Sequence, residues 1–274
     1  MRLRIRHETT YDYTPAARYA IQILRMMPRS YEGLFVRRWR VEVDADTRLE
    51  KGEDAFGNIT HTLFMDGPVE TVHVMIDGEV DTVDTGGVMR GALERMPTPL
   101  YLRETRLTEC TPDMRRFARD VLTGEGGDRL AAMHAMMVRL HSDMRFAPGM
   151  TTSATPAGEA FSAGHGVCQD FAHIFVACAR SIGVPARYVG GYFLRTDSID
   201  QDAGHAWAEA YLQGIGWIAF DPAHGMCTTD RYCRVAVGLD YLDAAPVRGS
   251  RVGGGDEKLN VQVQVQQGRT IKQG

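Results

Sequence analysis

Long apolar runs are absent from this 274-residue sequence. No stretch approaches the roughly 18 consecutive apolar residues that a membrane-spanning helix requires. The segment from Met1 to Tyr13 alternates charged and apolar side chains, which is not the pattern of a signal peptide. We therefore expect a cytoplasmic protein without a membrane partner.

An excess of basic residues is also lacking. Acidic residues outnumber basic residues by 35 to 31, which gives a formal net charge of -4. General nucleic-acid binders need a dominant basic surface, so a nucleic-acid partner is not expected. The basic clusters at 37–40 and 115–119 are interpreted as solvated faces.

Cysteine is scarce, and its spacing is not that of a zinc finger. The five cysteines are Cys110, Cys168, Cys178, Cys227 and Cys233. An odd number leaves at least one thiol unpaired, and a long chain of this kind without an export signal is typical of a reducing compartment. His224 lies near Cys227 and Cys233, which leaves a structural metal site as an alternative, although the paired short spacing is missing. We expect no metal and no cofactor.

The first 85 or so residues favour β structure. β-branched and aromatic residues alternate with polar ones at 39–43, 59–64 and 69–76, and the segment 54–58 supplies a turn. Repeated strands without intervening helices predict a small β-sandwich-like or barrel-like domain. Glycines and prolines between 86 and 99 mark a change of character after it.

The rest of the chain mixes helices with strands. Residues 111–113 are typical of a helix start, and residues 128–144 carry apolar side chains at helical spacing. Valines alternate with glutamines at 261–265, which predicts a strand with one buried face. The prediction is an α+β protein with these parts: an N-terminal β-rich domain at 1–90, a catalytic core at 91–268 and a flexible tail at 269–274.

Cys168 is the candidate nucleophile. Gly164 and Gly166 permit a tight loop before it, and a strongly amphipathic helix begins immediately after it and stops at Gly183. Free amide groups and the positive end of the helix dipole favour thiolate over thiol at such a position. The backbone N–H of Cys168 is also a candidate donor of an oxyanion hole. Asp170 brings a negative charge into the first turn, which partly opposes thiolate formation. The alternative is a small buried cysteine near a helix start.

A predicted hairpin supplies the base and the group that orients it. Residues 204–212 favour a strand, 213–216 a turn and 217–221 a returning strand. His205 and Asp221 lie at the open end of this hairpin, although the sequence leaves their register open. A carboxylate there can accept the imidazole N–H and turn the other ring nitrogen toward a thiol.

Two other side chains of the hairpin have alternative roles. Trp207 is a candidate wall of the substrate-binding cleft, or else a core aromatic. Glu209 either faces solvent or pairs with a cation such as Arg187, and we assign it no catalytic role.

These motifs resemble the bacterial transglutaminase-like superfamily, whose members are often described as cysteine proteases. The segments of the core that carry the resemblance are 166–171, 183–188, 205–207, 216–217 and 221–222. Outside the core, segments 24–29 and 54–58 resemble the β domain of the bacterial branch, and 235–241 and 246–249 resemble that branch as well. The resemblance implies a papain-like core, in which a helix that carries the cysteine packs on an antiparallel sheet, preceded by a small β-sandwich-like domain.

The resemblance also implies the roles of the site residues. Cys168 is the nucleophile, His205 the general base and acid, and Asp221 the orienting group. His224 stands where asparagine is more usual in the family, which alters the polarity near the triad.

The implied reaction is acyl transfer from a peptide or protein amide through a thioester. Hydrolysis is preferred over transamidation, because cross-linking would be hazardous among cytoplasmic proteins. The alternatives are an acyltransferase of the arylamine N-acetyltransferase kind and a non-catalytic peptide-binding module on a degenerate fold. The oligomeric state is left open.

Overall fold

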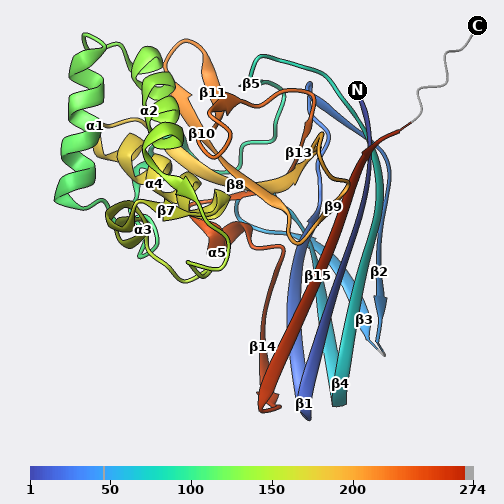
Figure 1. Cartoon of the computed structure of the whole chain (residues 1–274). Coiled ribbons are helices and arrows are strands. Elements are labelled where there is room, and N and C mark those ends of the chain that lie inside the picture. Colours follow the sequence, from blue (N-terminus) through green and yellow to red (C-terminus); the bar gives the residue numbers. More distant parts are fainter. Residues whose placement is uncertain (46, 269–274) are drawn as a thin grey trace, which may run out of the picture.

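The computed structural model describes residues 1–45 and 47–268 and contains two units (Figure 1). One is a sheet of long strands, and the other combines helices with a second sheet. Strands pair antiparallel within both sheets. This arrangement confirms the predicted α+β class.

The first sheet folds over on itself. Its N-terminal strands are β1 (Arg2–Met27), β2 (Leu34–Asp44), β3 (Arg48–Glu53) and β4 (Ile59–Thr82). β1 and β4 pair along most of their length, and their register shifts between Asp12 and Ala17. Tyr11 and Leu24, which lie on opposite sides of this irregularity, nevertheless share one apolar core. The bend therefore produces two layers, as expected for a β-sandwich-like domain (Figure 1).

Strands from the other end of the chain complete this sheet. β14 (Val247–Gly253) and β15 (Asp256–Gln267) both pair with β1, and the short strand β9 (Asp200–Gln201) pairs with β15. The segments fall within the predicted core range of 91–268, but the structure places them in the sheet of the N-terminal domain.

The valine–glutamine alternation behaves as predicted. Val263 and Val265 are buried, whereas the glutamines between and beside them are exposed. The predicted strand at 261–265 is therefore confirmed as part of β15. The predicted tail at 269–274 lies outside the described residues.

The second sheet is covered by helices on one side (Figure 1). Its strands, in spatial order, are β12 (Met226–Cys227), β11 (Gly216–Asp221), β10 (His205–Leu212), β8 (Ala186–Phe193) and β13 (Tyr232–Gly238), with β5 (Val88–Met89) beside β11. The helices are η1 (Thr98–Leu102), α1 (Pro112–Gly124), α2 (Arg129–Asp143), α3 (Ala157–Ala163), α4 (Cys168–Ser181) and α5 (Tyr241–Ala244). Two short strands, β6 (Arg145–Phe146) and β7 (His165–Gly166), form a parallel pair.

Side-chain caps begin the first two helices where the sequence predicts them. The Thr111 hydroxyl accepts the N–H of Met114 at 3.4 Å, and the Asp128 carboxylate accepts two N–H groups of α2 at 2.9 and 3.1 Å. Each cap satisfies N–H groups that the helix itself leaves unpaired. Within the described residues, no helix combines the length and apolar character that a bilayer crossing demands.

Helix α4 lies at the centre of the helical unit. Every residue from 170 to 180 is buried, and its apolar side chains share one core with α1, α2, β10 and β11. The helix is therefore held from several sides, and its first residue, Cys168, has a well-defined position.

Apolar contacts join the two units. Leu3 of β1 and Val265 of β15 pack in one cluster with Tyr192 of β8 and Cys233 of β13. The joint between the two sheets is thus a buried interface close to the strands of the second sheet.

The predicted turn at 54–58 adds a polar contact between the units. The Asp54 carboxylate accepts the N–H groups of Phe56 and Asn58, both at 3.0 Å. The Asn58 amide then donates to the carbonyl of Val237 at 2.7 Å and accepts its N–H at 2.8 Å. The turn therefore extends the edge of β13 through a side chain.

A buried carboxylate, Glu209, holds two arginines below the second sheet. Glu209 is 0% exposed, and it accepts hydrogen bonds from Arg187 at 2.6 Å and Arg234 at 2.7 Å. Arg187 also donates to Glu94 and lies 3.9 Å above the ring of Trp217. The predicted pairing of Glu209 with Arg187 is confirmed.

Replacing Glu209 by alanine should destabilise the protein strongly. The change leaves two buried or half-buried guanidinium groups without their shared carboxylate, which costs about 3–5 kcal/mol of unfolding free energy. Urea unfolding followed by circular dichroism measures this loss. Glu50→Ala is the control, because Glu50 pairs with Arg48 at 3.2 Å on the surface and should change stability far less. Equal losses in the two variants would contradict a structural role for the buried network.

Candidate active site

Cys168 is the first residue of α4, and the loop before it is held by the helix itself. The Asp170 carboxylate accepts the N–H of Val167 at 2.8 Å and the hydroxyl of Thr151 at 2.7 Å. A side chain at Gly166 would place its Cβ 2.6 Å from Asp170, so only glycine lets the loop come this close. The predicted helix start at Cys168 is confirmed.

Asp170 therefore has a structural role, which is to hold the loop that precedes α4. It is 1% exposed, and burial raises the pKa of its carboxyl group above the ordinary value, against the effect of its hydrogen bonds. The group caps the N-terminus of α4 rather than acting as a free negative charge beside the thiol. As the first helical residue, Cys168 has a backbone N–H with no partner inside the helix, which suits an oxyanion-hole donor.

The register of the hairpin brings His205 and Asp221 together. Ala208 pairs with Phe220, and continuing this register by one residue places Asp221 opposite Trp207, two residues from His205. Side chains two residues apart on neighbouring strands share a face of the sheet and lie within reach of each other. The His205 Nε2 atom lies 2.6 Å from the Asp221 Oδ2 atom.

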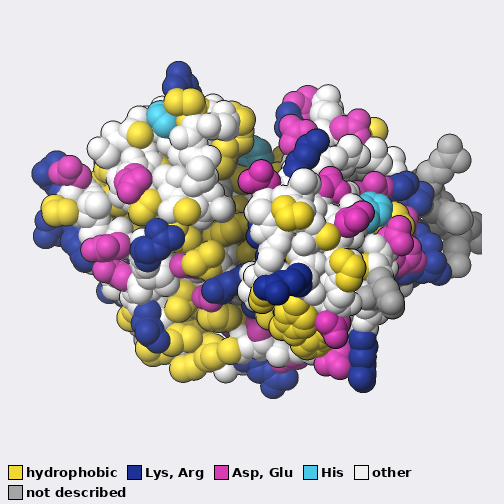
Figure 2. All heavy atoms as spheres, turned by 90° about the horizontal axis from the view of Figure 1, so that it is seen from below, with side chains coloured by type: hydrophobic (Ala, Val, Ile, Leu, Met, Phe, Trp, Pro, Cys, Tyr) yellow, Lys and Arg dark blue, Asp and Glu magenta, His cyan; other side chains and the backbone are white. Residues whose placement is uncertain are grey.

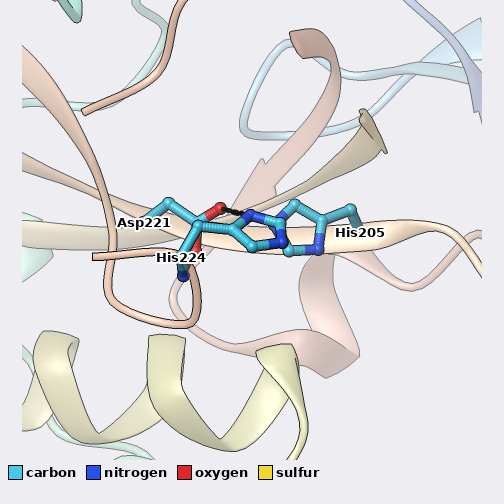
Figure 3. Close-up of side chains that lie close together, drawn as sticks. All are labelled: His205, Asp221 and His224. Carbon is cyan, nitrogen blue, oxygen red and sulfur yellow. Dashed lines mark hydrogen bonds and ion pairs between the residues drawn. The ribbon is translucent and has the colours of Figure 1, made fainter. Parts of the chain in front are cut away.

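The Asp221 carboxylate is fully buried and accepts five hydrogen bonds. Oδ2 is shared by His205, by His224 Nδ1 at 2.7 Å and by the Tyr232 hydroxyl at 2.8 Å. Oδ1 accepts the N–H groups of Ala223 at 3.0 Å and His224 at 3.2 Å. Figure 3 shows the two imidazole rings side by side, with Asp221 at one end.

These contacts control the protonation of His205. Burial disfavours the charged ring, but the Asp221 carboxylate and hydrogen bonding with Cys168 together raise the pKa of His205 to about 10. Burial likewise opposes ionisation of Asp221, but His205 and His224 hold its pKa below the ordinary range. Because Nε2 faces Asp221, the Nδ1 atom of His205 is the one left for the thiol.

A cleft of ≈ 260 Å³ opens beside Cys168 and His205. One wall comes from α4, β8 and β10, and the facing wall comes from β1 and β15, including His7 and Leu259. The cleft therefore lies between the two units, with the candidate nucleophile at its border.

The assignment of Trp207 to the wall of this cleft is wrong. Trp207 is 1% exposed, and it packs with Val189, Phe193 and Tyr232 in an apolar cluster of the second sheet. It does not line the cleft, although its ring stacks behind His205 with centroids 6.1 Å apart. Its role is to support the imidazole from the core.

The potential metal ligands that lie close together are not the set considered in the sequence, which was His224, Cys227 and Cys233. In residues 1–45 and 47–268, the group of potential ligands that comes together is His205, Asp221 and His224, with ligand atoms within 4.8 Å of one another. Cys227 instead lies 3.9 Å from His134, and Cys233 is buried at the joint between the units. His205 Nε2 and His224 Nδ1 both bond the same oxygen, Asp221 Oδ2.

Tyr232 and the position of His224 are the functional features that the sequence analysis missed. Tyr232 carries no local signal, because it reaches Asp221 only through the pairing of β13 with β8. His224 is visible in the sequence three residues after Asp221, but its ring direction depends on the turn after β11.

Comparisons with known proteins agree with this description. Residues 115–222 match the family model of the transglutaminase-like superfamily, and residues 3–81 match that of the bacterial transglutaminase-like N-terminal region. An uncharacterized Mycobacterium leprae protein, ML0607, is 30% identical over 96% of this chain and 98% of its own length. The Mycobacterium tuberculosis protein Rv2569c is 29% identical over 90% of this chain and 87% of its own.

A solved structure shares the whole fold. The crystal structure of a proposed cysteine protease from Cytophaga hutchinsonii superposes with a TM-score of 0.77 and covers 100% of this chain and 92% of that one. The sequence identity is 21%, so the likeness concerns the fold. Because the whole chain is covered, the likeness extends over both units.

The raised pKa of His205 makes a pH-dependent contribution to stability. A group whose pKa is higher in the folded state stabilises that state fully below its unfolded pKa, here the ordinary 6.5, and loses this effect as the pH rises toward about 10. The stability difference between the wild type and His205→Ala should therefore shrink between these limits. Urea unfolding at closely spaced pH values measures it.

Asp221→Asn provides the control background for this measurement. It removes the charge that raises the pKa of His205, so the effect of His205→Ala should depend much less on pH there. A difference that is constant with pH in the wild-type background would show that the imidazolium is not stabilised as described.

Proposed function

The chain belongs to the transglutaminase-like superfamily, and from this premise we propose that it is a cysteine-nucleophile enzyme that hydrolyses amide bonds. The observation that carries the proposal is the arrangement of the three side chains. Cys168 begins a buried helix, His205 lies next to it, and Asp221 holds the far nitrogen of the ring at 2.6 Å. This is the order of nucleophile, base and orienting group that covalent catalysis requires.

The first half of the reaction forms a thioester. The Cys168 sulfur attacks the carbonyl carbon of the amide, and the carbonyl oxygen becomes an oxyanion that the Cys168 N–H can bind. The imidazolium of His205 gives its Nδ1 proton to the departing nitrogen as the C–N bond breaks. The amine leaves, and the acyl group remains on sulfur.

The second half returns the enzyme to its starting state. His205, now neutral, takes a proton from water, and the resulting hydroxide attacks the thioester carbonyl. The C–S bond breaks, the acid product leaves, and the thiolate–imidazolium pair is restored. Asp221 keeps one tautomer and one ring direction through both halves, and Tyr232 and His224 hold Asp221 in turn.

Hydrolysis is the preferred outcome because it needs only water as the acceptor. Transamidation needs a second site that binds an amine and excludes water. An acetyl-CoA-dependent acyltransferase and a peptide-binding module without turnover are the competing functions, and the measurements below distinguish them.

Alkylation by iodoacetamide tests the assembled site without knowledge of the substrate. At neutral pH, Cys168 should react at least about tenfold faster than Cys227, because a neighbouring imidazole and the N-terminus of a helix increase the reactivity of a thiol. Cys227 is a matched control: it is half-buried like Cys168, but burial raises its pKa to about 11. Peptide mass spectrometry on the native protein gives the rate at each cysteine.

His205→Ala should slow the labelling of Cys168 and leave Cys227 unchanged. If Cys168 is instead labelled as slowly as Cys227, and His205→Ala does not change its labelling rate, the ion pair does not form. The peptide-binding module would then be the better hypothesis.

Cys168→Ala should reduce amide turnover by a factor on the order of 10⁴ or more, because the thioester can no longer form. A panel of peptide amides and glutamine-containing peptides, followed by release of amine or ammonia, measures the activity. Cys227→Ala should retain it. Turnover that requires acetyl-CoA would favour the acyltransferase, and full activity of Cys168→Ala would disprove the proposal.

A further inference from the structure

The wall of the cleft that faces Cys168 is built by the first sheet. Tyr11 of β1 and Leu259 and Val261 of β15 line it, opposite the end of α4. Figure 2 shows hydrophobic side chains gathered along the hollow between the two units. Leu259 is 52% exposed, although Val263 and Val265 at alternate positions of the same strand are buried.

The cleft lacks charged side chains other than those of the reacting pair. Among the nineteen described residues that line it, none is a lysine, arginine, aspartate or glutamate. The protein surface as a whole is rich in such residues, since 24% of the chain is charged. The cleft is therefore a distinctly apolar part of the molecule.

Two polar side chains on the facing wall, His7 and Thr9, already have hydrogen-bond partners. His7 Nδ1 lies 2.9 Å from the Tyr192 hydroxyl, and His7 Nε2 lies 3.0 Å from the Thr9 hydroxyl. Burial lowers the pKa of His7 to about 4, so this ring is neutral at pH 7. Among the described lining residues, this wall carries no charged side chain that could pair with a charged substrate group.

Size and polarity together define what fits. An enclosed apolar cavity of about 150 Å³ accommodates a benzene molecule, and this cleft measures ≈ 260 Å³. A charged side chain that entered it would lose hydration without gaining a counter-ion, which is costly. A branched aliphatic or aromatic side chain would bury its apolar surface against Leu259 and Val261.

We propose that Tyr11, Leu259 and Val261 form a specificity wall that selects an uncharged, apolar side chain next to the amide that is cleaved. That the amide is cleaved rests on the proposed function, whereas the selection of the side chain is a property of the cleft around Cys168. It can therefore be measured through the reactivity of Cys168 alone.

Three iodoacetamide derivatives provide the test. They carry a benzyl group, a cationic 2-aminoethyl group or an anionic carboxymethyl group on the amide nitrogen. Each rate of Cys168 labelling is divided by the rate for glutathione, which removes intrinsic reactivity. The benzyl reagent should have a normalised rate at least about tenfold above those of both charged reagents, within the range that one side-chain contact supplies.

Leu259→Asp should reverse part of this preference. The exposed carboxylate would give the cationic reagent a partner, so the ratio of aminoethyl to benzyl labelling should rise about tenfold. Val252→Asp is the matched control, because Val252 is 50% exposed on β14 of the same sheet and does not line the cleft. It should leave the ratio unchanged.

Peptide amides then separate this proposal from the proposed function. If benzyl labelling is preferred but no amide is hydrolysed, the specificity wall stands and the hydrolase proposal fails. If peptides are cleaved with equal kcat/KM for phenylalanine, lysine and aspartate next to the amide, the hydrolase stands and the wall is disproved. Equal normalised labelling by all three reagents, or equal effects of Leu259→Asp and Val252→Asp, would also overturn the wall.

Discussion

The buried carboxylate of Asp221 is the constraint on which the rest of the site depends. An ionised carboxylate without water is strongly unfavourable unless hydrogen bonds replace its hydration. Five donors from β10, β13 and the turn after β11 perform this replacement. Each donor is a backbone or side-chain group whose position follows from the second sheet, so the register of that sheet determines where His205 points.

The other half of the site depends on the beginning of α4. The helix is buried along its length, and the loop before it is closed by the Asp170 carboxylate against Gly166. Cys168 is thus positioned by the helix core, while His205 is positioned by the sheet. The packing of α4 on β10 brings these two independently supported groups together.

Much of this arrangement could be predicted from the sequence, because its signals are local. The helix start at Cys168, the hairpin at 204–221 and the cap at Thr111 all depend on residues close to one another in the chain. Features that depend on distant pairing could not be predicted. The strand β15 pairs with β1 although most of the chain lies between them, and the residues of neither segment indicate which strand it pairs with.

Two further differences have the same origin. Trp207 shares its face of β10 with His205, so the alternation of residues in the sequence does not show whether that face lines a cleft or covers a core. In the fold, side chains of the neighbouring strands bury Trp207. For Asp170, the presence of a charge in the first helical turn was correctly seen, but its direction depends on the backbone of residues 166 and 167. The sequence therefore shows which types of side chain are present, whereas the direction in which each side chain points depends on the fold.

The pairing of β15 with β1 has a consequence for how the site can vary. The proposed reacting groups belong to α4, β10 and β11, whereas the facing wall belongs to strands near the two ends of the described chain. The side chains of Leu259 and Val261 make no hydrogen bond that supports Asp221, so substitutions there leave its five donors in place. The chemistry of the wall can thus change while the geometry of Cys168, His205 and Asp221 is preserved. In the proposed enzyme, the specificity wall and the proposed reacting groups thus belong to different units of the fold.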